Sequence, residues 1–377
     1  MHKRVGAYLQ KALKGEETLA AAMDPRCRVT FMLPAYGEPI LRILEVLESI
    51  LRMQGADVLS EVICLVNNPE DDGTERERKA RRMNTLLLEL PVWRNADAFF
   101  GAHRFSREII ERAQNIREHL PVYVIDKSHL GKELHAGNVG RARNRVLAEA
   151  VLRYERAGRE GLLVSTDADV QFTDAHYLKK LLALFDQEPE LIAVSGGVDF
   201  VFDPDTQIPE ERDRLRAAFD RFILERSWAE IERFLQGAES QMAPEHAFFG
   251  SHMIMRSRHA AAVGGFAPLA KHEDTQLGKL FCSSAVKNGF RVGNAKRLLR
   301  VQVALRESNR TAASFLPVLL RELDASKQVP HPQTGERVPL THAVAEHACE
   351  RLETSHTGRV LRREIGDLSR LLYKDVL

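Results

Sequence analysis

The sequence lacks the features that would place the protein outside the ordinary globular classes. Its four cysteines lie far apart in 377 residues, and no pair has the spacing of a metal-binding or redox motif. We therefore expect reduced thiols and a cytoplasmic protein. No run of about eighteen apolar residues occurs, which excludes a membrane-spanning helix. The basic N-terminus lacks the apolar centre of a signal peptide.

A strong net charge is also missing. Lys and Arg number 54 and Asp and Glu 53, which leaves a charge of +1 at pH 7. Such a balance gives no general field that attracts nucleic acid, so we expect no nucleic-acid partner, and local basic groups must hold any anionic ligand. No GxGxxG follows an apolar run, which disfavours a dinucleotide-binding dehydrogenase.

The first 26 residues predict an amphipathic helix. One helical face is apolar and carries Val5, Tyr8, Leu9, Ala12 and Leu13. Most basic residues lie elsewhere: Lys3, Arg4, Lys11 and Lys14. Such a helix either packs on its own domain, which is the commoner case, or docks on a membrane surface. The second interpretation leaves open a peripheral position at the inner face of a membrane.

Short apolar runs alternate with longer helical patterns through the next part of the chain. The apolar runs are 28–33, 61–67, 121–127, 161–167 and 191–202, and the helical patterns are 38–54, 75–90, 138–158 and 175–185. Runs rich in Val, Ile and Leu without polar alternation are typical of strands covered on both faces. The alternation predicts an α/β fold with a mainly parallel central sheet flanked by helices.

The pattern changes after residue 203, where a long charged helix is predicted over 209–236. The final segment predicts a helical C-terminal extension over 311–377, broken by a loop at 328–339. We therefore expect an N-terminal helix over 1–26 and one catalytic domain over 27–310. The long, charged segment 71–120 is a candidate lid or acceptor surface.

Polar or turn-forming groups occur where three of the apolar runs end. The first run is followed by Pro34, Ala35, Tyr36 and Glu38, the second ends at Asn67, and the fourth ends in Asp167, Ala168 and Asp169. Ligands collect at the carboxyl ends of strands in such sheets. Two carboxylates this close repel each other, which indicates a cation, and oxygen ligands select Mg²⁺ or Mn²⁺. A helix N-cap role for one aspartate explains the position equally well.

Other candidate groups occur along the chain. A second Asp-x-Asp, Asp203 and Asp205, lies in an acidic, proline-containing loop and is interpreted as a turn. Glu273 and Asp274 follow a glycine turn and indicate either a helix N-terminus or a general base.

Basic residues form two further candidate sites. Arg141, Arg143 and Arg145 begin a predicted helix, where they form either a solvated face or a phosphate contact. The segment 306–310, RESNR, is a second anion-binding candidate.

Taken in order, these segments resemble the family 2 glycosyltransferases of the GT-A fold over roughly residues 27–310. The segments that carry the resemblance are VTFMLPAYGEP, VICLVNNPEDD, GNVGRARNRVLAEA, LLVSTDADV and GSHMIMRSRHAAAVGGFAPLAKHEDTQLGKLF. The resemblance implies the GT-A fold of nucleotide-diphospho-sugar transferases. It also implies a hexosyltransferase-like enzyme that depends on Mn²⁺ or Mg²⁺.

The resemblance also implies roles for individual residues. The base and ribose of a nucleotide-diphosphate sugar would lie against Pro34, Ala35, Tyr36, Glu38 and Asn67, with Arg141 and Arg143 as further donor-binding candidates. Asp169 would hold the cation, and Asp167 would contact the ribose or the metal. Asp274, beside Glu273, would take the proton from an acceptor hydroxyl as the anomeric carbon inverts. The acceptor would be a saccharide, a lipid-linked molecule or a small molecule, with His252, Gly265, Phe266 and His272 near it.

The chain departs from this family at Asn67 and Asn68, where the family usually carries an aspartate for the nucleobase. Two alternatives remain. A nucleotidyltransferase that makes nucleotide sugars would need a glycine-rich, basic loop after the first strand, but PAYGEP has one glycine and no basic residue. A non-catalytic nucleotide-sugar-binding protein would have no need to retain Asp167, Asp169 and Asp274 together. For His252 and His272, a structural role is commoner than one as a ligand or as a group orienting Asp274.

Overall fold

The computed structural model describes residues 1–68, 74–95, 104–134, 138–202, 248, 250–270, 272–305, 328–330 and 337–339. The chain divides into two compact units, residues 1–201 with 243–304, and residues 202–242 with 305–377. In the second unit, β9 (Gln328–Pro330) and β10 (Arg337–Pro339) form a two-stranded antiparallel sheet. The loop predicted at 328–339 thus contains two short strands. The predicted helices at 209–236 and on either side of that loop, the Asp203 and Asp205 turn and the segment 306–310 lie outside the described residues.

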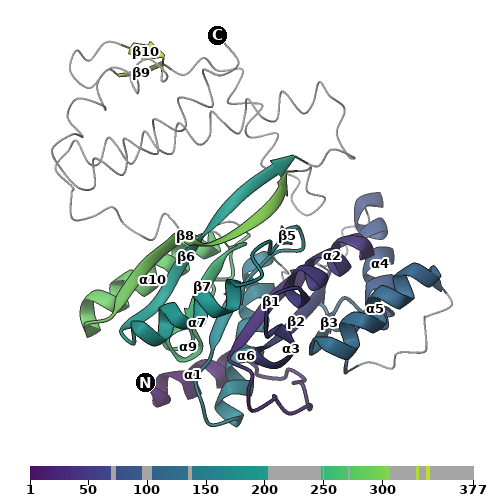
Figure 1. The fold of residues 1–377 in the computed structure, drawn as a ribbon, viewed down its shortest axis with the longest axis horizontal. Helices are drawn as coiled ribbons and strands as arrows, with labels where there is room; N and C mark the ends of the chain where they lie inside the picture. Colours follow the sequence, from purple (N-terminus) through teal and green to yellow (C-terminus); the bar gives the residue numbers. More distant parts are fainter. Residues whose placement is uncertain are drawn as a thin grey trace. The chain divides into compact units, whose positions relative to one another are not determined.

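The first unit is built on an eight-stranded sheet of order β3-β2-β1-β4-β7-β6-β8-β5 (Figure 1). Its strands are β1 (Val29–Ala35), β2 (Ser60–Asn67), β3 (Val122–Lys127), β4 (Leu162–Ser165), β5 (Val170–Gln171), β6 (Leu191–Phe202), β7 (Met253–Arg256) and β8 (Arg291–Leu305). The first four pair in parallel, as predicted, whereas β7 runs antiparallel to β4 and β6, and β5 antiparallel to β8. The sheet is therefore mixed.

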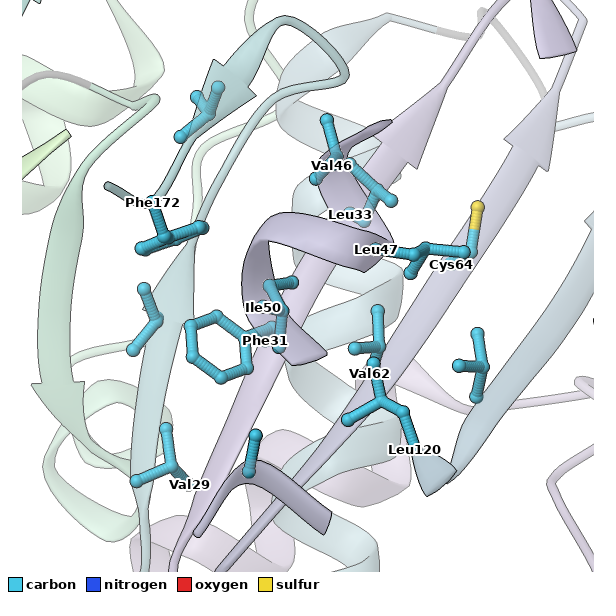
Figure 2. Close-up of a cluster of buried hydrophobic side chains, with 14 of the residues drawn as sticks. Val29, Phe31, Leu33, Val46, Leu47, Ile50, Val62, Cys64, Leu120 and Phe172 are labelled. Carbon is cyan, nitrogen blue, oxygen red and sulfur yellow. The ribbon is translucent and has the colours of Figure 1, made fainter. Parts of the chain in front are cut away.

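Helices cover both faces of this sheet. They are α1 (His2–Ala12), α2 (Ile40–Leu51), α3 (Ala56–Leu59), α4 (Glu75–Leu88), α5 (Arg107–His119), α6 (Val139–Arg156), α7 (Tyr177–Gln187), α9 (Ser257–Ala262) and α10 (Glu273–Asn288). Along β1, Phe31 and Leu33 enter one apolar cluster with α2, α4, α5 and α7, while Met32 enters a second with α1, α6, α9 and α10. This alternation explains why the strands read as unbroken apolar runs. Figure 2 shows part of the first cluster, where side chains of β1 and β2 meet α2.

The N-terminal helix α1 packs on its own domain. It contacts α6 and α9, and its apolar residues Val5 and Tyr8 are buried. The segment after it runs along α6, where Arg153 Nη1 donates to the carbonyl of Ala21 (2.5 Å) and Arg159 Nη1 to that of Pro25 (2.5 Å). Of the two interpretations of this helix, the structure shows packing on the domain. None of the helices in the described residues is long and apolar enough to cross a membrane.

The segment 71–120 contributes to the core in its described part. Helices α4 and α5 pack over the first cluster, which includes Leu87, Trp93 and Ile116. The Trp93 indole donates to the carbonyl of Leu87 (2.9 Å). The packing of these two helices on the sheet contradicts a lid formed by them, whereas an acceptor surface on their outer faces stays a prediction. Residues 69–73 and 96–103 lie outside the described part.

Candidate active site

The Asp-x-Asp segment lies in a tight turn at the carboxyl end of β4. The carbonyl of Asp167 accepts a hydrogen bond from the backbone N–H of Val170 (3.2 Å), where β5 begins. The nearest following helix, α7, has His176 as its N-cap, so neither aspartate caps a helix and that alternative is wrong. Asp167 is buried and Asp169 is half-buried. Asp169 therefore presents the more accessible carboxylate at this sheet edge.

One buried arginine joins the two predicted carboxylate pairs. From α6, Arg143 Nη2 donates to Asp167 Oδ1 (2.6 Å) and Nη1 donates to Glu273 Oε1. Only 4% of the Arg143 side chain is exposed. Burial opposes its charge, but the carboxylates of Asp167 and Glu273 outweigh burial and raise the pKa of Arg143. Neither sequence interpretation of Arg143 was correct, since it forms no solvated face and is committed to carboxylates of its own chain.

Asp274 is the accessible member of the second pair. Its Oδ2 accepts the backbone N–H of Gly250 (2.7 Å) and its Oδ1 that of Thr275 (2.7 Å), while the side chain remains half-buried. Glu273, in contrast, is buried against Arg143, and burial together with the charge of Asp274 raises the pKa of Glu273. Of the two acids, Asp274 is therefore the one that can meet a substrate.

Gly250 is a site residue that the sequence did not reveal. A Cβ at this position would collide with the guanidinium of Arg143. Because Gly250 has no side chain, the Arg143 guanidinium can lie against it while the Gly250 N–H donates to Asp274. In the sequence it belongs to the segment GSHMIMRSRHAAAVGGFAPLAKHEDTQLGKLF but was given no role, because its contacts come from α6 and α10, far away along the chain.

The turn before α10 holds a strained residue. His272, the N-cap, has φ of 63°, which makes it the one non-glycine residue with positive φ in the described part of the chain. Such a conformation is unfavourable for a side chain other than glycine and persists only where surrounding contacts impose it. His272 is exposed and lies two residues before Asp274 in the sequence, and its role as an acceptor contact stays a prediction.

The ends of β1 and β2 form the predicted nucleotide side of the site. Pro34, Ala35 and Glu38 are buried and Tyr36 is half-buried. A further residue missed from the sequence, Asn84 of α4, joins these ends. Its Nδ2 donates to the Asn67 carbonyl (2.9 Å), and its Oδ1 accepts the Gly37 N–H (2.8 Å).

Asn67 itself has a buried amide oxygen. Its Oδ1 has no hydrogen-bond partner within the described residues. A buried acceptor without a partner costs about 1–3 kcal/mol, which a donor group on a ligand would recover. Asn67 therefore fits the predicted role of binding a nucleobase.

The start of α6 is closed by its own chain. Asn138 Oδ1 accepts the Arg141 N–H (3.0 Å), and the Gly140 N–H donates to the Leu269 carbonyl (3.1 Å). A side chain at position 140 would collide with the carbonyl of Ala267. Two of the amides predicted for phosphate contact are thus already bonded, which argues against that role. The place of half-buried Arg141 on the donor side stays a prediction.

Arg145, the third arginine of this helix, turns away from the site. Its Nε donates to Glu16 Oε2 (3.1 Å) and its Nη1 to Glu149 Oε2 (3.0 Å). With 3% of its side chain exposed, it is no part of a solvated face. It fastens the N-terminal segment to α6.

Three predicted acceptor residues have structural positions instead. His252 is fully buried between the Tyr177 hydroxyl (2.7 Å from Nε2) and the Gly197 carbonyl (2.8 Å from Nδ1). Phe266 is buried in the second apolar cluster. Gly265 is buried with φ of 70°, and a side chain there would collide with Asn144. Because all three are buried and packed within the protein, the acceptor prediction is corrected for them.

The buried position of His252 predicts a pH dependence of stability. Burial lowers its pKa from 6.5 to about 4, so the unfolded chain binds a proton that the folded chain refuses between these values. Folding should lose up to about 3 kcal/mol as the pH falls from 6.5 towards 4. Urea unfolding at pH 7 and pH 5 measures the part of this loss that falls above pH 5, about 2 kcal/mol. His252→Gln, which keeps one donor and one acceptor, should show less of it, and an equal loss in both proteins would contradict the assignment.

The chemistry of Asp167 and Asp169 fits a hard divalent cation held jointly with a ligand. In the described part of the chain, no three His, Cys, Asp or Glu side chains gather to form a complete metal site. One oxygen of Asp167 already accepts from Arg143, which leaves the half-buried Asp169 as the main carboxylate. Since Mg²⁺ is commonly bound through one or two carboxylates plus substrate phosphates, the remaining oxygens would come from a diphosphate.

A cavity of about 340 Å³ lies away from these residues, at the amino ends of the strands, where Cys27, Ser60 and Pro121 line it. The charged groups along it are largely satisfied internally. Arg26 bonds Asp24, and Glu61 pairs with Arg153 (2.7 Å). The cavity includes none of the candidate residues, so the site is assigned from the carboxylates and not from this cavity.

Comparisons with known proteins find only distant similarities. No protein-family model and no curated protein matches the chain. Among solved structures, it is similar to the mannosyltransferase PcManGT from Pyrobaculum calidifontis in complex with GDP-Man and Mn²⁺, with 15% identity, 100% of this chain and 88% of that chain covered, and a TM-score of 0.43. It is also similar to TarS 1-349 from S. aureus in complex with UDP-GlcNAc, with 13% identity, 91% of this chain and 81% of that chain covered, and a TM-score of 0.40.

A third similar structure is glucosyl-3-phosphoglycerate synthase from Mycobacterium tuberculosis in complex with Mn²⁺ and UDP-glucose, with 14% identity, 85% and 80% coverage and a TM-score of 0.39. These three solved structures are a mannosyltransferase, TarS and glucosyl-3-phosphoglycerate synthase, each in complex with a nucleotide sugar. TM-scores below 0.5 do not establish what this chain binds.

Proposed function

We propose that the protein is a metal-dependent glycosyltransferase that moves a sugar from a nucleotide-diphosphate sugar to an acceptor hydroxyl. One observation carries the proposal: two carboxylate pairs, far apart in the sequence, meet at one sheet edge. Asp167 and Glu273 share the guanidinium of Arg143, and each has a more accessible aspartate beside it, Asp169 and Asp274. The site thus offers Asp169 as a carboxylate for a cation and Asp274 as a separate carboxylate for a base.

The donor would lie across the carboxyl ends of β1, β2 and β4. Its nucleobase would offer an N–H to Asn67 Oδ1, which has no other partner in the described part of the chain. Its diphosphate would reach the turn of Asp167 and Asp169. A divalent cation held there by Asp169, with Asp167, would neutralise the charge that develops on the leaving diphosphate.

Asp274 would act as the general base. The acceptor hydroxyl oxygen forms a bond to the anomeric carbon, and its proton passes to the Asp274 carboxylate. The bond from that carbon to the diphosphate oxygen breaks, and its electron pair leaves with the nucleoside diphosphate. Attack opposite the leaving group inverts the anomeric configuration. The backbone N–H groups of Gly250 and Thr275, which donate to the Asp274 carboxylate, hold it in a fixed orientation for this step.

A thermal-shift panel tests the donor site. UDP, GDP, ADP and CDP, with the sugars UDP-glucose, UDP-GlcNAc and GDP-mannose, would be added with and without Mn²⁺. We expect one nucleotide family to raise the melting temperature in a metal-dependent way, because a ligand that binds only the folded state stabilises it. Asp169→Ala should lose the metal-dependent part of the shift.

A surface carboxylate provides the control for this panel. Asp186 of α7 is exposed and pairs with Arg28, which precedes β1 at the opposite end of the strands. Asp186→Ala should keep the full metal-dependent shift. If no nucleotide stabilises the wild type, the proposed function is contradicted. Stabilisation without turnover of any nucleotide sugar would instead support the non-catalytic alternative.

A further inference from the structure

We propose that Arg143 is a positioning residue that fixes the distance between the donor side and the acceptor side of the site. The inference rests on the proposed function and deepens it. Arg143 donates to neither Asp169, the proposed cation ligand, nor Asp274, the proposed base. It holds Asp167, two residues before Asp169, and Glu273, which immediately precedes Asp274. Through these neighbours, one guanidinium sets where both accessible carboxylates stand.

The burial of Arg143 makes this link rigid. Its side chain is 4% exposed, that of Asp167 12% and that of Glu273 5%. Charges removed from water this far are tolerated only when they are paired with good geometry. The planar guanidinium donates from two separate nitrogens in a fixed fork, so it can hold two carboxylates at once. Neither carboxylate can leave it without exposing a buried, unpaired charge.

Three separate parts of the chain meet at this guanidinium. Asp167 comes from the turn after β4, Glu273 from the first turn of α10, and Gly250 from the segment before β7. Gly250 lies directly against the guanidinium and also donates its N–H to Asp274. A displacement of Arg143 would therefore move Asp274 through both Glu273 and Gly250. It would also move the turn of Asp167 and Asp169.

A lysine at this position would keep the charge and lose the fork. Its ammonium is a compact point charge on a flexible chain, which can approach one carboxylate closely but cannot hold two in fixed relative positions. Arg143→Lys thus separates positioning from charge. The expected effect falls on turnover, because a misplacement of about 1 Å between reacting groups can lower the rate by about 100-fold.

The same helix offers a matched control. Arg145 is equally buried, with 3% of its side chain exposed, and it also pairs with two carboxylates, Glu16 and Glu149. Its partners belong to the N-terminal segment and to α6 itself, away from the candidate site. Arg145→Lys therefore imposes a comparable structural loss without touching Asp167 or Glu273.

The experiment compares both lysine variants with the wild type in three measurements. These are the melting temperature, the affinity for whichever of UDP, GDP, ADP and CDP binds with Mn²⁺, and the release of nucleoside diphosphate from the matching nucleotide sugar with water as acceptor. We expect similar losses of melting temperature in both variants. Only Arg143→Lys should lose about 100-fold in turnover, with its nucleotide affinity lowered by less than about 10-fold.

A second variant covers the case in which Arg143→Lys does not fold. Glu273→Gln keeps an oxygen that accepts from Arg143 but removes the charge that anchors α10. It should lower turnover by about 10-fold and leave nucleotide affinity unchanged. Arg143→Lys with the turnover of Arg145→Lys, or Glu273→Gln with wild-type turnover, would overturn the inference alone. A wild type that binds none of the nucleotides, or turns over none of their sugars, would overturn the proposed function as well.

Discussion

Asp274→Asn is expected to lower the rate of sugar transfer by about 10³-fold, because general base catalysis typically contributes 10²- to 10⁴-fold. The amide cannot take the proton of the acceptor hydroxyl. Nucleotide affinity in the presence of Mn²⁺ should stay nearly unchanged, since Asp274 lies on α10 and not on the strand ends that would hold the donor. Steady-state rates at saturating donor, beside calorimetric affinities, measure the two quantities separately.

The hydrogen bonds of Asp274 mean that Asp274→Asn should also lose some stability, so the variant needs a control. Both of its oxygens accept backbone N–H groups, so an asparagine must turn its NH₂ towards one of them. That mismatch should cost about 1–3 kcal/mol of stability. Gln276→Ala changes an exposed residue of the same helical turn, and it should retain the rate within a few-fold. If Asp274→Asn transferred sugar at the wild-type rate, the base would have to be another group.

Gly250→Ala is expected to destabilise the protein by about 3–5 kcal/mol, the usual cost of breaking a buried ion pair. The new methyl group would collide with the guanidinium of Arg143. An arginine end is flexible in general, but this one cannot withdraw without leaving Asp167 and Glu273 buried and unpaired. Urea unfolding with its midpoint and slope measures the loss. Turnover should fall too, because the Gly250 N–H also orients Asp274.

The same substitution at Gly6 serves as the control for Gly250→Ala. Gly6 is exposed within α1, and a Cβ there would meet nothing within 4 Å. Gly6→Ala should stabilise the helix by up to about 1 kcal/mol, because alanine has the higher helix propensity. Equal stability of Gly250→Ala and the wild type would show that the guanidinium does not lie against residue 250.

The pattern of apolar residues in the sequence was sufficient to predict most strands of the sheet. The apolar runs of β1 to β4 and β6 were predicted because strands covered on both faces are continuously apolar. The strands β5 and β7 were not predicted, since β5 has two residues and β7 four, too few for a clear period. The positions of Asp167, Asp169 and Asp274 followed from their place after a strand or at a helix start.

The charge balance of the site could not be obtained from local pattern. The spacing of Arg141 and Arg145 suggested a shared solvated face, yet Arg143 and Arg145 are both buried on different sides of α6. Their partners are distant in sequence, so no window of neighbouring residues reveals them. From the sequence, the close spacing of Asp167 and Asp169 was explained by a bound metal ion or by a helix N-cap. Instead, the protein itself supplies a positive charge, the Arg143 guanidinium, to Asp167.

The place of β7 between β4 and β6 has a consequence for biosynthesis. As the ribosome makes the chain, β1 to β4 can pair as soon as they emerge, but the outer edge of β4 has no partner until Met253 arrives opposite Ser165. During that interval the nascent chain exposes an apolar strand edge, which is a template for aggregation. Chaperones that shield such edges would act in this window. Only after β7 has paired can Gly250 and Asp274 join Arg143, so the candidate active site is among the last parts of the unit to form.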